Sequence, residues 1–174
     1  SYDSPKKIIQ SLRKIYPNAV GQRSHSLHVS SHILQACSEL GFKYESNIFL
    51  PLHEGLHPVQ RFKNLYSIPI YWSDDKHIEL GTSFNVNLNT YRDSGLKVLN
   101  FHPIHIFMNT SSDEHYASYK SHYQQPDSLK EFINGSKEGI GTMFRSLVDI
   151  LRIQEKETYT LLQICQAYSS YENL

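Results

Sequence analysis

The spacing of apolar residues predicts helices at both ends of the chain. Ser4 and Pro5 are suited to an N-cap and a first helical residue, and apolar residues then recur at helical spacing up to position 15. Ser30 or Ser31 opens the next predicted helix, "HILQACSEL", and Gly41 ends it. Towards the C-terminus, residues 140–156 are strongly amphipathic, and two capping boxes indicate further helices. These boxes are Ser128-x-x-Glu131 and Thr160-x-x-Gln163.

Short apolar runs between these helices predict strands. They are "NAVGQRS", "GFKYESNIF", "YSIPIYW" and, as the clearest strand, "LKVLNFHPIHIF" at residues 96–107. "LPLHEGLHPVQRF" (residues 50–62) is typical of a loop, and residues 76–95 are polar and irregular. Because strands alternate with helices early in the chain, the order favours parallel pairing and an α/β class. The length of 174 residues suits a single domain over residues 1–174.

Composition narrows the function classes. The chain has 17 Lys plus Arg and 17 Asp plus Glu, which gives a formal net charge of zero. This balance argues against electrostatic binding to nucleic acid or to acidic lipid. The 12 tyrosines and 10 histidines suit a polar cleft that holds sugar, or equally a tyrosine-rich surface. Cys37 and Cys165 lie in helix-like apolar patterns and are expected to be buried free thiols. No apolar run approaches the roughly 20 residues of a membrane span, and no signal peptide is evident, so we expect a cytoplasmic location.

Arg23 and His25 lie where a short predicted strand meets a helix, in "GQRSHSLHVSSHIL". Ligands of α/β folds gather at the carboxyl ends of parallel strands, so this pair is a candidate site. His28 would share a face with His25 on a helix and oppose it on a strand. The alternative is that His28 and His32 lie on the exposed face of the next helix.

Two adjacent carboxylates, Asp74 and Asp75, follow the strand predicted in "YSIPIYW". Such a pair can supply a base, a metal ligand or a partner for a histidine. Ser-Asp-Asp is also an ordinary turn sequence, and both interpretations stay open at this point.

His102 and His105 lie in the last predicted strand, on either side of Pro103. Proline makes a regular central strand unfavourable beyond that point, so His102 is predicted to end the strand. His105 has the opposite parity and is expected either to have a structural role or to support a site residue without touching the ligand. A metal needs converging ligands, and H-P-I-H is a poor metal motif. "HEGLH" at residues 53–57 has the spacing of the metalloprotease pattern H-E-x-x-H, but that pattern needs a helix. Gly55 and Pro58 argue against a helix, so the segment is interpreted as a loop.

Three segments together carry a family resemblance. The order of "RSHSLH", "GFKYESNIFLP" and "NFHPIHIF" resembles a bacterial branch of the polysaccharide deacetylase (NodB-homology) superfamily, in its C-terminal two thirds. The resemblance implies a partial, distorted (β/α) barrel with C-terminal helices, and a divalent metal that is often zinc. The family's first two motifs, which supply the base and the main metal ligands, are not present before residue 23, so the chain is expected to lack N-terminal βα units.

The resemblance also implies residue roles. Arg23 is similar to the arginine that orients the base, and His102 is similar to the general acid that a carboxylate, Asp74 or Asp75, holds in place. His25 is a candidate metal ligand, although the main ligands are expected upstream. Three aromatic side chains are suited to stacking on sugar rings: Tyr44, Tyr71 and Trp72. For Trp72, burial in the barrel wall is the favoured alternative.

The resemblance implies a metal-dependent hydrolase that removes N-acetyl or O-acetyl groups from a bacterial glycan. Its partner would be a carbohydrate, with no nucleic acid and no membrane span. The alternatives are a non-catalytic carbohydrate-binding or scaffold domain of the same fold, and another metal-dependent amidohydrolase acting on a small cyclic amide.

Overall fold

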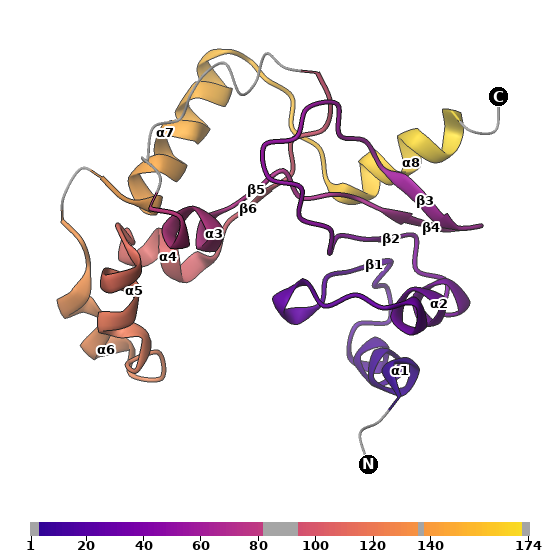
Figure 1. Ribbon diagram of the computed structural model, residues 1–174, viewed down its shortest axis with the longest axis horizontal. Coiled ribbons are helices and arrows are strands. Elements are labelled where there is room, and N and C mark those ends of the chain that lie inside the picture. The colour runs from indigo at the N-terminus through magenta and orange to yellow at the C-terminus, as the bar shows by residue number, and fades with distance from the viewer. Residues whose placement is uncertain (1–3, 82–93, 136–137, 172–174) are drawn as a thin grey trace. The chain divides into compact units, whose positions relative to one another are not determined.

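The computed structural model describes residues 4–81, 94–135 and 138–171, and these residues have a mixed α/β fold (Figure 1). The chain divides into two compact units, and each is described by itself. The first unit takes in residues 1–71 and 158–174, and the second takes in residues 72–157.

The first unit contains a four-stranded sheet in the order β1-β2-β4-β3. Its strands are β1 (Gly21–Gln22), β2 (Tyr44–Glu45), β3 (Val59–Phe62) and β4 (Leu65–Ser67). β1 pairs with β2 and β2 with β4 in parallel, as the order of elements predicts, while β3 and β4 form an antiparallel hairpin. The prediction of a loop over residues 50–62 is therefore wrong for its last four residues, which form β3. All four residues of β3 are exposed, so they lack the alternation that would have revealed a strand.

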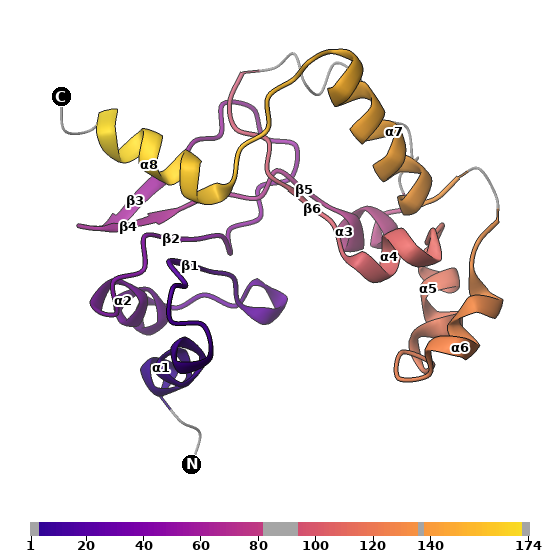
Figure 2. The ribbon, with the colours of Figure 1, turned by 180° about the vertical axis from the view of Figure 1, so that it is seen from behind.

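The first unit also contains helices. They are α1 (Pro5–Ile15), η1 (His25–Leu27), α2 (Ser31–Glu39) and α8 (Leu161–Tyr171). α2 packs against β3 and β4, and α8 packs against β2, as the two opposite views of the ribbon show (Figures 1 and 2). The buried cluster joins Leu34 and Cys37 of α2 to Phe42 and Leu65. Both cysteines are free and buried, which confirms the expectation from their apolar patterns.

The helix ends of the first unit follow the sequence signals. Ser4 and Ser30 accept hydrogen bonds from backbone N–H groups three residues on, and each is the N-cap of its helix. Gly41 follows α2 with φ +77°, a left-handed conformation that favours glycine. The Thr160 N–H donates to Gln163 Oε1 at 2.8 Å, and the Gln163 N–H donates to Thr160 Oγ1 at 3.2 Å. This reciprocal pair confirms the predicted capping box before α8.

The second unit joins two short parallel strands to a group of helices. The strands are β5 (Trp72–Ser73) and β6 (Leu99–Asn100). The helices are α3 (Asp74–Glu79), α4 (Pro103–Met108), α5 (Asp113–Lys120), α6 (Pro126–Leu129), η3 (Lys130–Phe132) and α7 (Ile140–Ile153). A buried cluster of Met108, Tyr119 and Leu129 holds α4, α5 and α6 together. This unit thus places a strand-to-helix junction at the end of each strand.

Three predictions fail within the second unit. The strand predicted over residues 96–107 ends at Asn100, and Pro103 instead begins α4, because proline is tolerated in the first turn of a helix. The region predicted to be irregular includes the end of α3, while residues 82–93 lie outside the described residues. The capping box predicted at Ser128 is wrong, because α6 already begins at Pro126.

α4 and α7 approach each other closely. A Cβ atom added at Gly141 would lie 2.5 Å from the carbonyl oxygen of Ile106, so only glycine fits there without a shift. The side chain of Asn109, at the end of α4, accepts a hydrogen bond from the Thr142 N–H at 3.0 Å. α7 therefore fixes α4 from one side, which matters because α4 carries part of the candidate site.

The two sheets are small and open. The mixed α/β class is observed, whereas closure into a distorted barrel stays a prediction. Within the described parts of the chain, no helix combines the length and the apolar character needed to cross a membrane.

Candidate functional site

Parallel pairing of β5 and β6 brings two chemical motifs together. Ser73 lies opposite Asn100 in register, so the residues that follow both strands emerge at the same edge. Asp74 comes next on one side, and His102 comes two residues after Asn100 on the other. Asn100 Nδ2 also donates to Ser73 Oγ at 3.0 Å, which ties the two junctions side by side. Residues 28 positions apart in sequence thus become neighbours.

Asp74 binds His102 through both carboxylate oxygens. Oδ1 lies 2.6 Å from His102 Nδ1, and Oδ2 accepts the His102 backbone N–H at 2.6 Å. Oδ1 also accepts the Asp75 N–H at 2.9 Å. The Asp74 side chain is fully buried, whereas that of His102 is 45% exposed. The pair therefore has a buried, anchored carboxylate and an imidazole whose other nitrogen, Nε2, is left for a ligand.

This geometry decides between the two adjacent carboxylates. Asp75 is exposed, and its Oδ1 accepts the Lys76 N–H at 2.9 Å as well as the Ser73 hydroxyl. It therefore serves the first turn of α3, while Asp74 holds the histidine. One ligand atom from each of Asp74, Asp75 and His102 lies within 4.8 Å of the others, a spacing that could accommodate a cation. Hydrogen bonds engage both oxygens of Asp74, Oδ1 of Asp75 and Nδ1 of His102, an arrangement suited to a histidine that transfers a proton through Nε2.

His105 lies directly behind this pair. It is 5% exposed, and its ring centroid is 5.7 Å from that of His102, at an interplanar angle of 78°. Nδ1 of His105 is within hydrogen-bond distance of two hydroxyls, Thr110 Oγ1 at 3.1 Å and Tyr119 OH at 3.2 Å. Burial lowers the pKa of His105 and raises that of Tyr119 to about 12. Sequence parity did not reveal this neighbour, because residue 105 is in a helix and not a strand.

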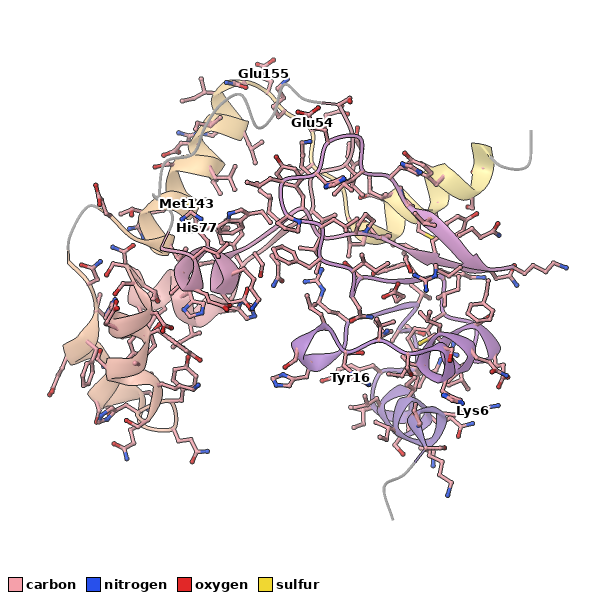
Figure 3. All side chains as sticks on the ribbon, in the orientation of Figure 1. Lys6, Tyr16, Glu54, His77, Met143 and Glu155 are labelled. Carbon is pink, nitrogen blue, oxygen red and sulfur yellow. The ribbon has the colours of Figure 1, made fainter. Side chains whose placement is uncertain are left out.

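Trp72 packs within the second unit. Its ring centroid is 4.9 Å from that of Phe101 and 5.3 Å from that of His77, which extends from α3 (Figure 3). Its role in stacking on a sugar stays a prediction.

The other predicted site residues lie in the first unit. Arg23 follows β1, and its Nε and an Nη donate to the backbone oxygen and the hydroxyl of Ser46, both at 3.0 Å. His25 opens η1 and is exposed. The ring of Tyr44 covers Gly21, where an added Cβ would lie 2.0 Å from it, and Tyr71 is 4% exposed. Metal binding by His25 and sugar stacking by Tyr44 and Tyr71 stay predictions.

A buried carboxylate supports the Arg23 segment and was missed in the sequence. Glu45 ends β2 and is fully buried, and its Oε2 accepts from Asn47 Nδ2 at 2.6 Å. Its other oxygen accepts from the Ser67 hydroxyl at the end of β4. Asn47 Oδ1 in turn accepts the Ser24 N–H at 2.7 Å. Polar groups at the carboxyl ends of three parallel strands thus hold the backbone beside Arg23, which is where α/β folds place ligands.

Comparison with known proteins gives the family. Residues 1–120, more than two thirds of the chain, match the family described as WbmS-like polysaccharide deacetylase. The chain belongs to this polysaccharide deacetylase family. The family match therefore confirms the resemblance and covers the arginine motif, both strand-to-helix junctions and the Asp74–His102 pair. No curated protein matches the sequence.

A solved structure supports the deacetylase assignment at the level of the fold. It is a protein of Bordetella bronchiseptica described as a candidate polysaccharide deacetylase involved in O-antigen biosynthesis. The two structures superpose with a TM-score of 0.77 at 28% sequence identity, and the match covers 86% of this chain. This deacetylase-family chain spans 63% of the length of that protein.

Proposed function

We propose that this chain is a glycan deacetylase in which His102 is the general acid and Asp74 holds it in place. The observation that carries the proposal is the pair of 2.6 Å contacts between a fully buried carboxylate and a half-exposed imidazole. The relative described as involved in O-antigen biosynthesis supports a bacterial acetylated glycan as the substrate class. A closed barrel around the site belongs to the same proposal.

His102 would deliver a proton to the leaving nitrogen of the sugar. Its Nδ1–H donates to Asp74, which fixes the tautomer and the ring position. In the protonated imidazole, Nε2 then carries the transferable proton on the exposed side of the ring. When the amide C–N bond breaks, this proton moves to the amine and leaves a neutral imidazole bonded to Asp74. If the substrate is O-acetylated, the same proton moves to the alcohol oxygen.

We propose that the divalent metal implied by the family is held outside the Asp74, Asp75 and His102 cluster. Asp74 is engaged through both oxygens and His102 through Nδ1, and His102 Nε2 is assigned here to proton transfer, so the main metal ligands are proposed to come from other residues. His25 remains a candidate ligand because its imidazole is exposed. Arg23 is proposed to orient the catalytic base through a charge-assisted contact.

Acetate release from acetylated glycans tests the proposal. The full chain is assayed on N-acetylated chitooligosaccharide and on acetylated O-antigen, with and without a chelator. His102→Ala should reduce turnover by about 10²- to 10⁴-fold, the usual contribution of a positioned general acid. His53→Ala, in an exposed loop, is the matched control. Near-normal turnover in His102→Ala would remove His102 from the mechanism, and glycan binding without acetate release would favour a non-catalytic binding domain.

A further inference from the structure

The histidine behind the proposed acid has no role in the proton transfer described above. His105 lies one helical turn from His102, and the backbone N–H of His105 donates to the backbone carbonyl of His102 at 3.0 Å. The two rings meet edge to face, with centroids 5.7 Å apart. Because His105 is almost fully buried, its ring is a fixed surface against the inner side of the exposed imidazole.

His105 is held from its other side by a pair of hydroxyls. Thr110 Oγ1 and Tyr119 OH lie 2.6 Å apart, and both are within 3.2 Å of His105 Nδ1. Tyr119 is fully buried and belongs to the core cluster of this unit. Its ring also packs on Tyr116, which itself contacts the His105 ring. The orientation of His105 is thus coupled to a well-packed part of the fold.

Asp74 alone does not fix the ring plane of His102. Its contacts hold two atoms of that residue, the backbone nitrogen and Nδ1. The imidazole could still tilt about these two points, and tilting would displace Nε2 on the exposed side. The ring of His105 bonds to the Thr110 and Tyr119 hydroxyls and not to Asp74, so it can limit the tilt of His102 without competing for the carboxylate.

We propose that His105 is a positioning residue that sets the ring plane of His102, and that Thr110 and Tyr119 lock His105 in place for this purpose. The role in turnover rests on the proposed function, whereas the effect on the His102 ring does not. An error of about 1 Å in the position of a catalytic atom can reduce the rate by up to about a hundredfold, so this constraint has a measurable consequence.

Two substitutions at His105 show whether His102 needs the aromatic ring as a packing surface or needs the ring nitrogens of His105 for chemistry. His105→Ala removes the surface and should reduce kcat about tenfold while KM changes less than about twofold. His105→Phe keeps an aromatic ring, and the Thr110 and Tyr119 hydroxyls can still bond to each other at their 2.6 Å separation. It should therefore restore kcat to within about threefold of the unmodified protein.

His115→Ala is the matched control. His115 is half-buried and packs on the Tyr119 ring, but it bonds to the Phe132 carbonyl at 2.7 Å. Its loss loosens the same helices without removing the surface behind His102. If the control lowers kcat as much as His105→Ala does, the effect is general packing and the positioning role is overturned.

NMR of histidine-labelled protein gives a readout that needs no substrate. Ring protons of His102 and His105 should show a mutual nuclear Overhauser effect, and the His102 ring signals should broaden or split in His105→Ala but not in His105→Phe. Unchanged His102 signals in His105→Ala would overturn the proposal. If these signals respond as expected but the unmodified protein releases no acetate, the proposed function fails and the positioning of His102 stands.

Discussion

Replacing the buried carboxylate is the sharpest test of the proposed acid. Asp74→Asn keeps the size of the side chain but converts one acceptor oxygen into an NH₂ donor. Both oxygens of Asp74 accept from N–H groups, so the new NH₂ meets a backbone donor in either orientation, that of His102 or that of Asp75. In the second orientation it also requires the His102 tautomer whose Nδ1 accepts, which places the ring proton on the wrong nitrogen for a bond to a carboxylate. The substitution also removes the negative charge that stabilises a protonated His102.

The magnitude follows from the contacts that are lost. A hydrogen bond to a charged group contributes about 1.5–3 kcal/mol, and a buried donor without a partner costs about 1–3 kcal/mol. Removal of the charge also relieves the cost of burying a carboxylate. We therefore expect the free energy of unfolding to fall by about 1–3 kcal/mol. Turnover should fall much further, by about 10²- to 10⁴-fold, because the acid loses both its orientation and its stabilising charge.

The assay is acetate release by the full chain, with unfolding followed by circular dichroism in urea. Asp149→Asn is the matched control, because Asp149 is an exposed carboxylate of the same unit that pairs with Arg152 at 3.3 Å. Such a surface pair contributes little, and both measurements should stay close to the unmodified values. Asp75→Asn should cost much less turnover than Asp74→Asn. Equal losses in the two adjacent substitutions, or an Asp74→Asn protein with full turnover, would refute the assignment of the pair.

The remaining predictions concern packing and titration. Gly141→Ala places a Cβ 2.5 Å from the Ile106 carbonyl oxygen. The free energy of unfolding, measured by thermal denaturation, should therefore fall by about 1–3 kcal/mol. Burial raises the pKa of Cys37 to about 11, so alkylation of this thiol by iodoacetamide at pH 8 should be slow in the folded protein and fast in urea. Burial lowers the pKa of His105 below its ordinary 6.5. As the pH falls, this imidazole therefore becomes protonated in the unfolded chain at a higher pH than in the folded protein. The free energy of unfolding should therefore fall as the pH drops below about 6.5, and this fall should be smaller in His105→Phe.

Part of the site can be predicted from sequence because it depends on element order. A carboxylate after one apolar run and a histidine after another suffice to expect a contact, provided the strands are parallel neighbours. The choice between Asp74 and Asp75 could not be made, because it depends on the residue at which α3 begins. Ser73 is the N-cap of that helix, and its contact with Asp75 leaves Asp74 facing β6.

The misassigned strand explains why the sequence does not predict that His105 lies beside His102. Apolar runs of this length are typical both of a strand and of a buried helix. The predicted strand assumes that side chains continue to alternate between two faces beyond Pro103. In a strand, His102 and His105 would face opposite ways, whereas three residues apart at the start of a helix they share a side. The proline that argued against a continued strand was also the signal for a helix start. Glu45 was missed for another reason, since its burial depends on Asn47 and Ser67 from neighbouring segments.

The start of α4 differs from the starts of α1, α2 and α5. Ser4, Ser30 and Ser112 are N-caps whose side chains accept a hydrogen bond from the first turn of α1, α2 and α5. α4 instead has His102 at this position, and its side chain makes no capping bond because the ring is engaged by Asp74. Pro103 lowers the cost, because it needs no partner for a backbone N–H. α6 and α7 also begin without a side-chain capping bond, so the missing cap alone does not mark a site. What distinguishes α4 is that its N-cap side chain is held instead by a buried carboxylate, and this residue is the one proposed as the acid.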